Sequence, residues 1–126
     1  MTPTQRTLKR LRELGYTAEV VERWNHYAQV RQDLFGFVDI VACGMGEPLR
    51  FIQATSASNH AARERKIESL PVAREIATAP GAIVYVWSWG KKGARGKVKS
   101  WTLRATAWTP RANGWQDLSK LFGEPA

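Results

Sequence analysis

Residues 34–43 read LFGFVDIVAC and residues 48–55 read PLRFIQAT, and these two stretches decide the fold. The first is rich in Phe, Val and Ile, which favours a strand with both faces buried. The residues between them, Gly44-Met45-Gly46-Glu47, have the composition of a turn. The sequence therefore predicts an antiparallel hairpin at the centre of the fold.

The residues before this hairpin predict a helix and a strand. Thr2 can cap a helix, Pro3 suits its first position, and Gln5 can close a capping box. Leucines at 8, 11 and 14 form one apolar stripe, and Gly15 is a helix end signal. Residues 16–24, YTAEVVERW, predict the next strand.

The residues after the hairpin predict a crossover back to the sheet. The expected elements are a helix over 59–79 that restarts at Pro71, a strand at 82–89, a glycine-rich basic turn at 90–96, a strand at 97–108, a turn at Asn113-Gly114 and a short helix at 115–122. The strand 48–55, helix, strand 82–89 unit can be a parallel crossover. We expect a single α/β domain over residues 1–126, with a mixed central sheet, a core at about 5–108 and helices on the sheet.

Composition limits the class of protein. The chain has 126 residues, 44% of them hydrophobic, which suits one core. Cys43 is the lone cysteine, so no disulfide framework exists and a reducing compartment is expected. No run approaches the roughly 18 apolar residues of a membrane span, and the basic N-terminus has no apolar core typical of a signal peptide. These features predict a cytoplasmic protein that does not enter a membrane.

The positive charge is concentrated in one segment. The net charge is +8, and residues 77–116 hold seven Lys or Arg and no acid. Cations there alternate with tryptophan, a pattern that suits phosphates and stacked bases and so predicts DNA as partner. The candidate nucleic-acid contacts are Arg31, Arg63, Lys91, Lys92, Arg95, Lys97 and Lys99. The aromatic residues Tyr85, Trp87 and Trp89 share one face of their strand, and we expect some of them to belong to the core instead.

Several chemistries are disfavoured, and one acid stands out. Two histidines and one cysteine cannot build a Zn²⁺ site by themselves, and the chain has neither a phosphate-binding P-loop nor a G-x-S-x-G elbow. Asp39 lies within the apolar stretch FVDIVA, where a charge is costly unless it is stabilised. It can be a buried acid bonded to the backbone or paired with Arg31, or it can be a metal ligand. We favour the metal ligand.

The expected hairpin register places further polar groups beside Asp39. If the loop is 45–47, partners across the two strands have residue numbers that sum to 92, so Asp39 stands opposite Gln53 on one face. Thr55 follows on the same face. A shift of one residue would move Asp39 and Gln53 to opposite faces.

The pattern GFVDIVA, a short turn and FIQATS resembles the core of the PD-(D/E)XK nuclease superfamily, particularly its Holliday-junction-resolvase-like branch. The strings RQDLFGFVDIVA and QATSASNHAARERKI are similar to small phage-encoded members, and the resemblance covers about residues 5–90. It implies an αβββαβ restriction-endonuclease-like core, phosphodiester hydrolysis with Mg²⁺ or Mn²⁺, and a bacterial or phage-infected host cell.

By that resemblance, Asp39 matches the metal-binding Asp, and the Ala54 carbonyl would face the metal. Gln53 stands at the position of the second acid and Thr55 at that of the catalytic Lys. Gln keeps an oxygen ligand but loses a charge, and Thr supplies no cation. Candidates to restore the carboxylate are Glu22 and Asp33, which we prefer, then Glu19, with Glu13 as the first-helix analogue. Lys66 or Arg63 on the following helix can replace the Lys, although both also suit a solvated face.

Two functions follow from the sequence. The first is a metal-dependent DNA endonuclease or branched-DNA resolvase, in which Asp39, Gln53, Thr55 and Lys66 form the catalytic set. The second is an inactive nuclease-fold module that binds nucleic acid or a host protein, which the Gln53 and Thr55 departures favour. Resolvase-like relatives often act as dimers because a junction presents two scissile strands. A homodimer is therefore a further expectation from the resemblance.

Overall fold

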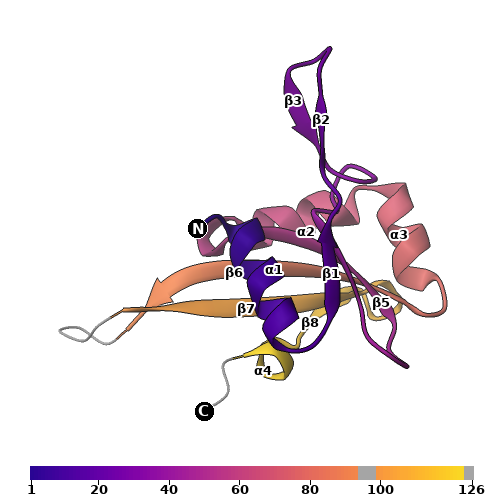
Figure 1. The fold of residues 1–126 in the computed structure, drawn as a ribbon. Coiled ribbons are helices and arrows are strands. Elements are labelled where there is room, and N and C mark those ends of the chain that lie inside the picture. The colour runs from indigo at the N-terminus through magenta and orange to yellow at the C-terminus, as the bar shows by residue number, and fades with distance from the viewer. Residues whose placement is uncertain (94–98, 124–126) are drawn as a thin grey trace.

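The computed structural model describes residues 1–93 and 99–123. It is a mixed α/β fold on a six-stranded sheet of order β1-β4-β5-β6-β7-β8, with a separate two-stranded hairpin β2-β3 (Figure 1). The elements are α1 (Pro3–Glu13), β1 (Thr17–Val20), β2 (Arg23–Asn25), β3 (Val30–Gln32), β4 (Ile40–Cys43), β5 (Leu49–Ser56), η1 (Ala57–Asn59), α2 (His60–Glu68), α3 (Pro71–Thr78), β6 (Ala82–Lys92), β7 (Ser100–Thr109), η2 (Pro110–Ala112), β8 (Gly114–Asp117) and α4 (Ser119–Phe122). Within these residues, no helix has the length and apolarity needed to cross a bilayer.

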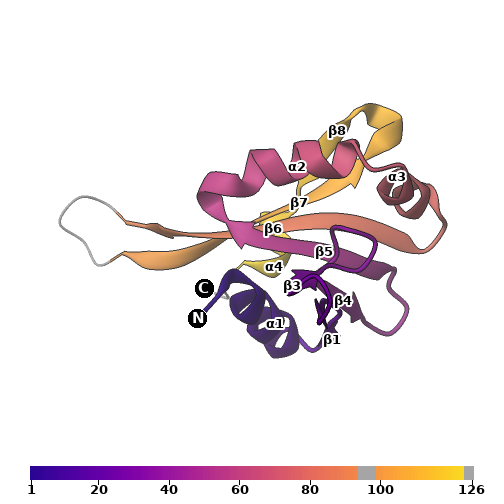
Figure 2. The same ribbon diagram turned by 90° about the horizontal axis from the view of Figure 1, so that it is seen from above.

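Helices cover both faces of the sheet. On one face α1 and α4 pack over Tyr85, Trp87 and Trp89, which are all buried. On the other face α2 and α3 pack over Val84 and Val86, as the view from above shows (Figure 2). The three aromatic residues therefore belong to the hydrophobic core, as expected for some of them, and are not exposed to a nucleic acid.

The central hairpin has the predicted register. β4 and β5 are antiparallel and pair Ile40 with Ile52. The Gln53 amide nitrogen donates to Asp39 Oδ2 at 3.2 Å, so the two side chains lie on the same face. The arrangement on which the site prediction depended is confirmed.

The strand boundaries before this hairpin differ from the prediction. Residues 34–38 are not part of a strand over 34–43, because Phe35 and Gly36 adopt positive φ of 56° and 82° and the chain closes a turn through a Leu34–Val38 bridge. The predicted strand 16–24 also divides. β1 ends at Val20, and the chain then leaves the sheet to form β2 and β3, which project from the body (Figure 1).

The second half follows the prediction in its crossover but not at its end. β5 and β6 are parallel, and α3 begins with Pro71 in its first turn. β6 continues through Gly90 to Lys92, so the predicted turn at 90–96 starts later, and residues 94–98 lie outside the described range. The first half of the predicted helix 115–122 is wrong. Those residues form β8, because Trp115 stacks on its cross-strand partner Trp108 at 5.9 Å.

Candidate metal centre

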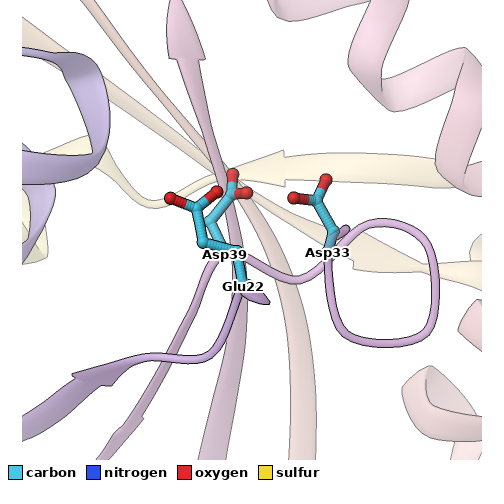
Figure 3. A group of neighbouring side chains, drawn as sticks. All are labelled: Glu22, Asp33 and Asp39. Carbon is cyan, nitrogen blue, oxygen red and sulfur yellow. The ribbon is translucent and has the colours of Figure 1, made fainter. Parts of the chain in front are cut away.

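Three carboxylates meet where the projecting hairpin joins the sheet. Glu22 lies between β1 and β2, Asp33 directly follows β3, and Asp39 directly precedes β4. One oxygen of each lies within 4.8 Å of the others, and the three carboxyl groups point to a common side (Figure 3). The two acids that the sequence favoured as additional ligands are thus brought to Asp39.

The hairpin explains why Glu22 and Asp33 meet although eleven residues separate them. β2 and β3 pair Arg23 with Gln32, so the next pair toward the body is Glu22 with Asp33. An antiparallel ladder places such partners about 4.5–5.5 Å apart at Cβ. The insertion therefore delivers two acids to a site whose third acid belongs to the central sheet.

Asp39 is the buried member of the group, with 5% exposure. Its Oδ2 accepts from the Ala54 backbone N–H at 2.8 Å and from the Gln53 amide at 3.2 Å. Burial, followed by a hydrogen bond to Asp33, raises the pKa of Asp39 to about 7. Without a cation, the Asp39 carboxyl therefore holds its proton up to near-neutral pH. Of the two structural alternatives for Asp39, the backbone bond is present, whereas the ion pair of Arg31 is to Glu22 at 3.3 Å and not to Asp39.

Gln53 supplies an oxygen that has no partner. Its side chain is 3% exposed, and Oε1 is buried without a hydrogen bond among the described residues. Such orphan atoms are rare in native proteins and point to a missing ion or water. The amide group is bonded to Asp39 and so belongs to the site. Three carboxylates beside an amide side chain offer hard oxygen donors of the kind that suits Mg²⁺ or Mn²⁺.

A second buried polar group, not anticipated from the sequence, fixes helix α2 over the sheet. His60 is fully buried, with Nδ1 2.6 Å from Ser88 Oγ and Nε2 2.8 Å from Thr106 Oγ1. Thr106 donates to Glu64 at 2.8 Å. Ser88 and Thr106 are polar residues inside apolar strands, and this was the sequence signal for a buried polar group. Their pairing with His60 could not be predicted without the three-dimensional course of the β5–α2–β6 crossover.

The anchoring of α2 sets the direction of its cations. Glu64 points to Thr106 on β7, and Arg63 is on the opposite flank of the helix because neighbouring positions differ by about 100°. Arg63 and Lys66 are both half-buried. Arg63 Nε is buried and has no hydrogen-bond partner among the described residues.

The remaining site candidates lie apart from the carboxylates. Thr55 is 5% exposed and shares the Gln53 face, but it brings no charge. Glu19 is exposed on β1 and is not in the acidic group. Glu13 lines a separate cavity of about 330 Å³ with Arg6 and Lys9. Glu22 and Asp33 thus lie beside Asp39, whereas Glu19 and Glu13 do not belong to this group.

The basic segment forms part of a two-stranded arm made by β6 and β7 that extends beyond the helices (Figure 2). Lys91, Lys92 and Lys99 are exposed there. Trp101 holds two cations, with the Arg6 guanidinium 3.7 Å and the Lys91 ammonium 5.4 Å from its ring. The remaining two candidates, Arg95 and Lys97, lie outside the described residues.

Comparison of the chain with protein-family models, curated proteins and solved structures found no match. Its function is therefore inferred from the chemistry of its own side chains.

Proposed function

We propose that this protein is a Mg²⁺- or Mn²⁺-dependent DNA endonuclease. The observation that carries the proposal is the meeting of Glu22, Asp33 and Asp39, with the Gln53 amide bonded to Asp39. Three acids within 4.8 Å repel one another when ionised, and a divalent cation would remove that cost. Gln53 stands where the nuclease pattern has its second acid. Glu22 and Asp33, which flank the β2-β3 hairpin, would supply carboxylates in its place.

The order of elements also supports a nuclease core. Ignoring the inserted hairpin, the chain runs α1, β1, β4, β5, α2 with α3, and β6. This is the αβββαβ order that the sequence resemblance implies. Asp39 borders β4 and Gln53 lies in the adjacent β5, as that resemblance requires.

Each residue has a definable role in phosphodiester hydrolysis. Glu22, Asp33, Asp39 and the Gln53 oxygen would hold the cation, which lowers the pKa of bound water and offsets charge on the phosphate. The water oxygen forms a bond to phosphorus as one P–O ester bond breaks, and the leaving oxygen takes a proton. Arg63 or Lys66 can stabilise the negative charge that develops, the task for which Thr55 is unsuited.

A nicking assay tests the proposal directly. Wild-type protein should nick plasmid or branched DNA only when Mg²⁺ or Mn²⁺ is present. Asp39→Asn should reduce the rate at least about a hundredfold, because it removes a ligand charge from the metal site. The matched control is Glu19→Gln, which neutralises an exposed acid of β1 outside the group and should keep wild-type activity.

The lack of a Lys at Thr55 favours a second candidate, a non-catalytic nucleic-acid-binding module on the same fold. This candidate replaces the first if neither cation supports nicking or raises the melting temperature. DNA binding itself would then persist through the basic arm.

Binding by the arm has its own measurement. Replacing Lys91 and Lys92 with Ala should reduce the slope of log K against log salt by about 2, at roughly 0.9 per phosphate contact. Lys120→Ala on α4 is the control and should leave the slope unchanged. An unchanged slope in the double variant would move the interface away from the arm. A homodimer, which would act on two strands of a junction, belongs to the same proposal and is testable by sedimentation with and without DNA.

A further inference from the structure

The β2-β3 hairpin carries a surface that continues directly from the carboxylates. Side chains alternate between the two faces of a strand, so Glu22 and Trp24 share one face of this hairpin. β2 and β3 pair Trp24 with Arg31 and Arg23 with Gln32, and the same register, continued by one residue, sets Glu22 opposite Asp33. The 3.3 Å contact between Arg31 and Glu22 is the expected diagonal neighbour on that face. One face therefore presents two acids at its base and an aromatic–cation pair beyond them.

This outer pair is open to solvent. Trp24 is 46% exposed, and the side chain of Arg31 is 70% exposed. Tyr27 at the tip is fully exposed, and the hairpin stands away from the body (Figure 1). Exposed aromatic residues gathered on one projecting element are typical of an interaction surface.

The charge of the hairpin selects the ligand. Residues 23–32 contain Arg23 and Arg31 and no acid. A cation beside an exposed indole fits a phosphate beside a base, and an indole stacks only on a base that is not already stacked in a duplex. An apolar protein partner would leave the arginine without a counter-charge. An acidic protein partner would leave the indole without a stacking partner.

We propose that the Trp24–Arg31 face binds a DNA strand with unpaired bases and holds it next to the carboxylates. The inference rests on the proposed nuclease function, since it takes that site as the place of the scissile phosphate. Trp24 lies two residues beyond Glu22, about 7 Å along a strand. With nucleotides at least 3.4 Å apart along a strand, the stacked base is about one or two nucleotides from the scissile phosphate. The enzyme would thereby select forks, gaps or branches over continuous duplex.

Equilibrium binding without divalent cations tests this proposal separately from catalysis. The probes are a fluorescein-labelled DNA fork with single-stranded arms and a fully paired duplex of equal length. Wild type should prefer the fork. Trp24→Ala should weaken fork binding about tenfold, since stacking on an aromatic side chain contributes about 1–3 kcal/mol per base, and should change duplex binding little.

Two further variants make the result specific. Trp24→Phe should restore most fork binding because it keeps an aromatic face. Val30→Ala is the matched control, since Val30 is 47% exposed on the opposite face of the same hairpin, and it should behave as wild type. Equal fork binding by Trp24→Ala and wild type at unchanged melting temperature overturns the inference. Absence of nicking or of a Mg²⁺ response, with Trp24-dependent fork preference intact, instead overturns the proposed chemistry.

Discussion

Two groups of polar side chains, each built around a buried residue, differ in how completely their atoms are paired. The first is the carboxylate group of Glu22, Asp33, Asp39 and Gln53 at the hairpin base. The second is the histidine group, made of His60, Ser88, Thr106 and Glu64.

The histidine group forms a complete chain of donors and acceptors. Thr106 donates to Glu64, so its oxygen accepts from His60 Nε2–H, and Nδ1 then accepts from the Ser88 hydroxyl. A neutral imidazole satisfies every member. Burial and then the nearby Arg104 keep the pKa of His60 below its usual value, which maintains that neutral form.

The carboxylate group has no such closure. It combines like charges with an amide oxygen that has no hydrogen-bond partner in the part of the chain that the structure describes. A buried network in which every polar atom has a partner stabilises the fold. A buried polar atom without a partner calls for an explanation such as a bound ion or water. The contrast separates the group that positions α2 from the group proposed to bind a metal.

The largest expected effect is on the histidine group. His60→Ala should lower the free energy of unfolding by about 3 kcal/mol, because it leaves Ser88 and Thr106 buried without one partner and opens a cavity. His26→Ala, on the exposed hairpin turn, is the control and should have almost no effect. Chemical denaturation measures both. A loss for His60→Ala no larger than the control would mean that the network does not anchor α2.

A smaller effect on the melting temperature, which depends on whether the cation is present, is expected at Gln53. Gln53→Glu adds a carboxylate beside Asp39 and should lower the apo melting temperature by about 4–8 °C, roughly 1–2 kcal/mol. Saturating Mg²⁺ should recover this loss because the ion binds only the folded state. Wild type should show a smaller Mg²⁺ shift, and Glu19→Gln should shift as wild type does. Identical curves with and without Mg²⁺ for Gln53→Glu would contradict a cation site.

A further expected effect, measured as a trend with pH and not as a single loss of stability, is that of Asp39→Asn. Because the folded pKa of Asp39 is about 7, above its unfolded value, the folded state holds the extra proton between about pH 4 and pH 7. Wild-type stability from this group therefore falls as pH rises through that window. The amide variant avoids this loss, so its melting temperature should exceed that of apo wild type near pH 8, and the difference should shrink toward pH 5. A constant difference across this range would show that Asp39 does not titrate there.

His60 should impose the opposite pH dependence, which sharpens the contrast. The pKa of His60 is lowered in the folded protein, so as pH falls the unfolded chain binds a proton at this histidine before the folded protein does. Stability from this group is present above about pH 6.5 and is lost as pH falls below it.

Local patterns were sufficient wherever near neighbours in the chain set the outcome. The capping box of Thr2 and Gln5, the restart at Pro71 and the hairpin register follow from backbone preferences and strand alternation, and all three are observed. The candidate set Asp39, Gln53, Glu22 and Asp33 was also correct as a neighbourhood. The strand expected at 16–24 was wrong because continuous β propensity does not show where a chain leaves one sheet to pair with itself.

The sequence by itself determined an α/β domain with a central hairpin, a buried acid opposite a glutamine and a basic aromatic segment. Only the tertiary structure decided that a hairpin between Glu22 and Asp33 brings both acids to Asp39, and that His60 reaches strands β6 and β7. The physical reason is that propensity and alternation act over a few residues, whereas these contacts depend on how separate elements pack. Packing places each polar atom either beside a partner, as around His60, or beside none, as at Gln53 Oε1.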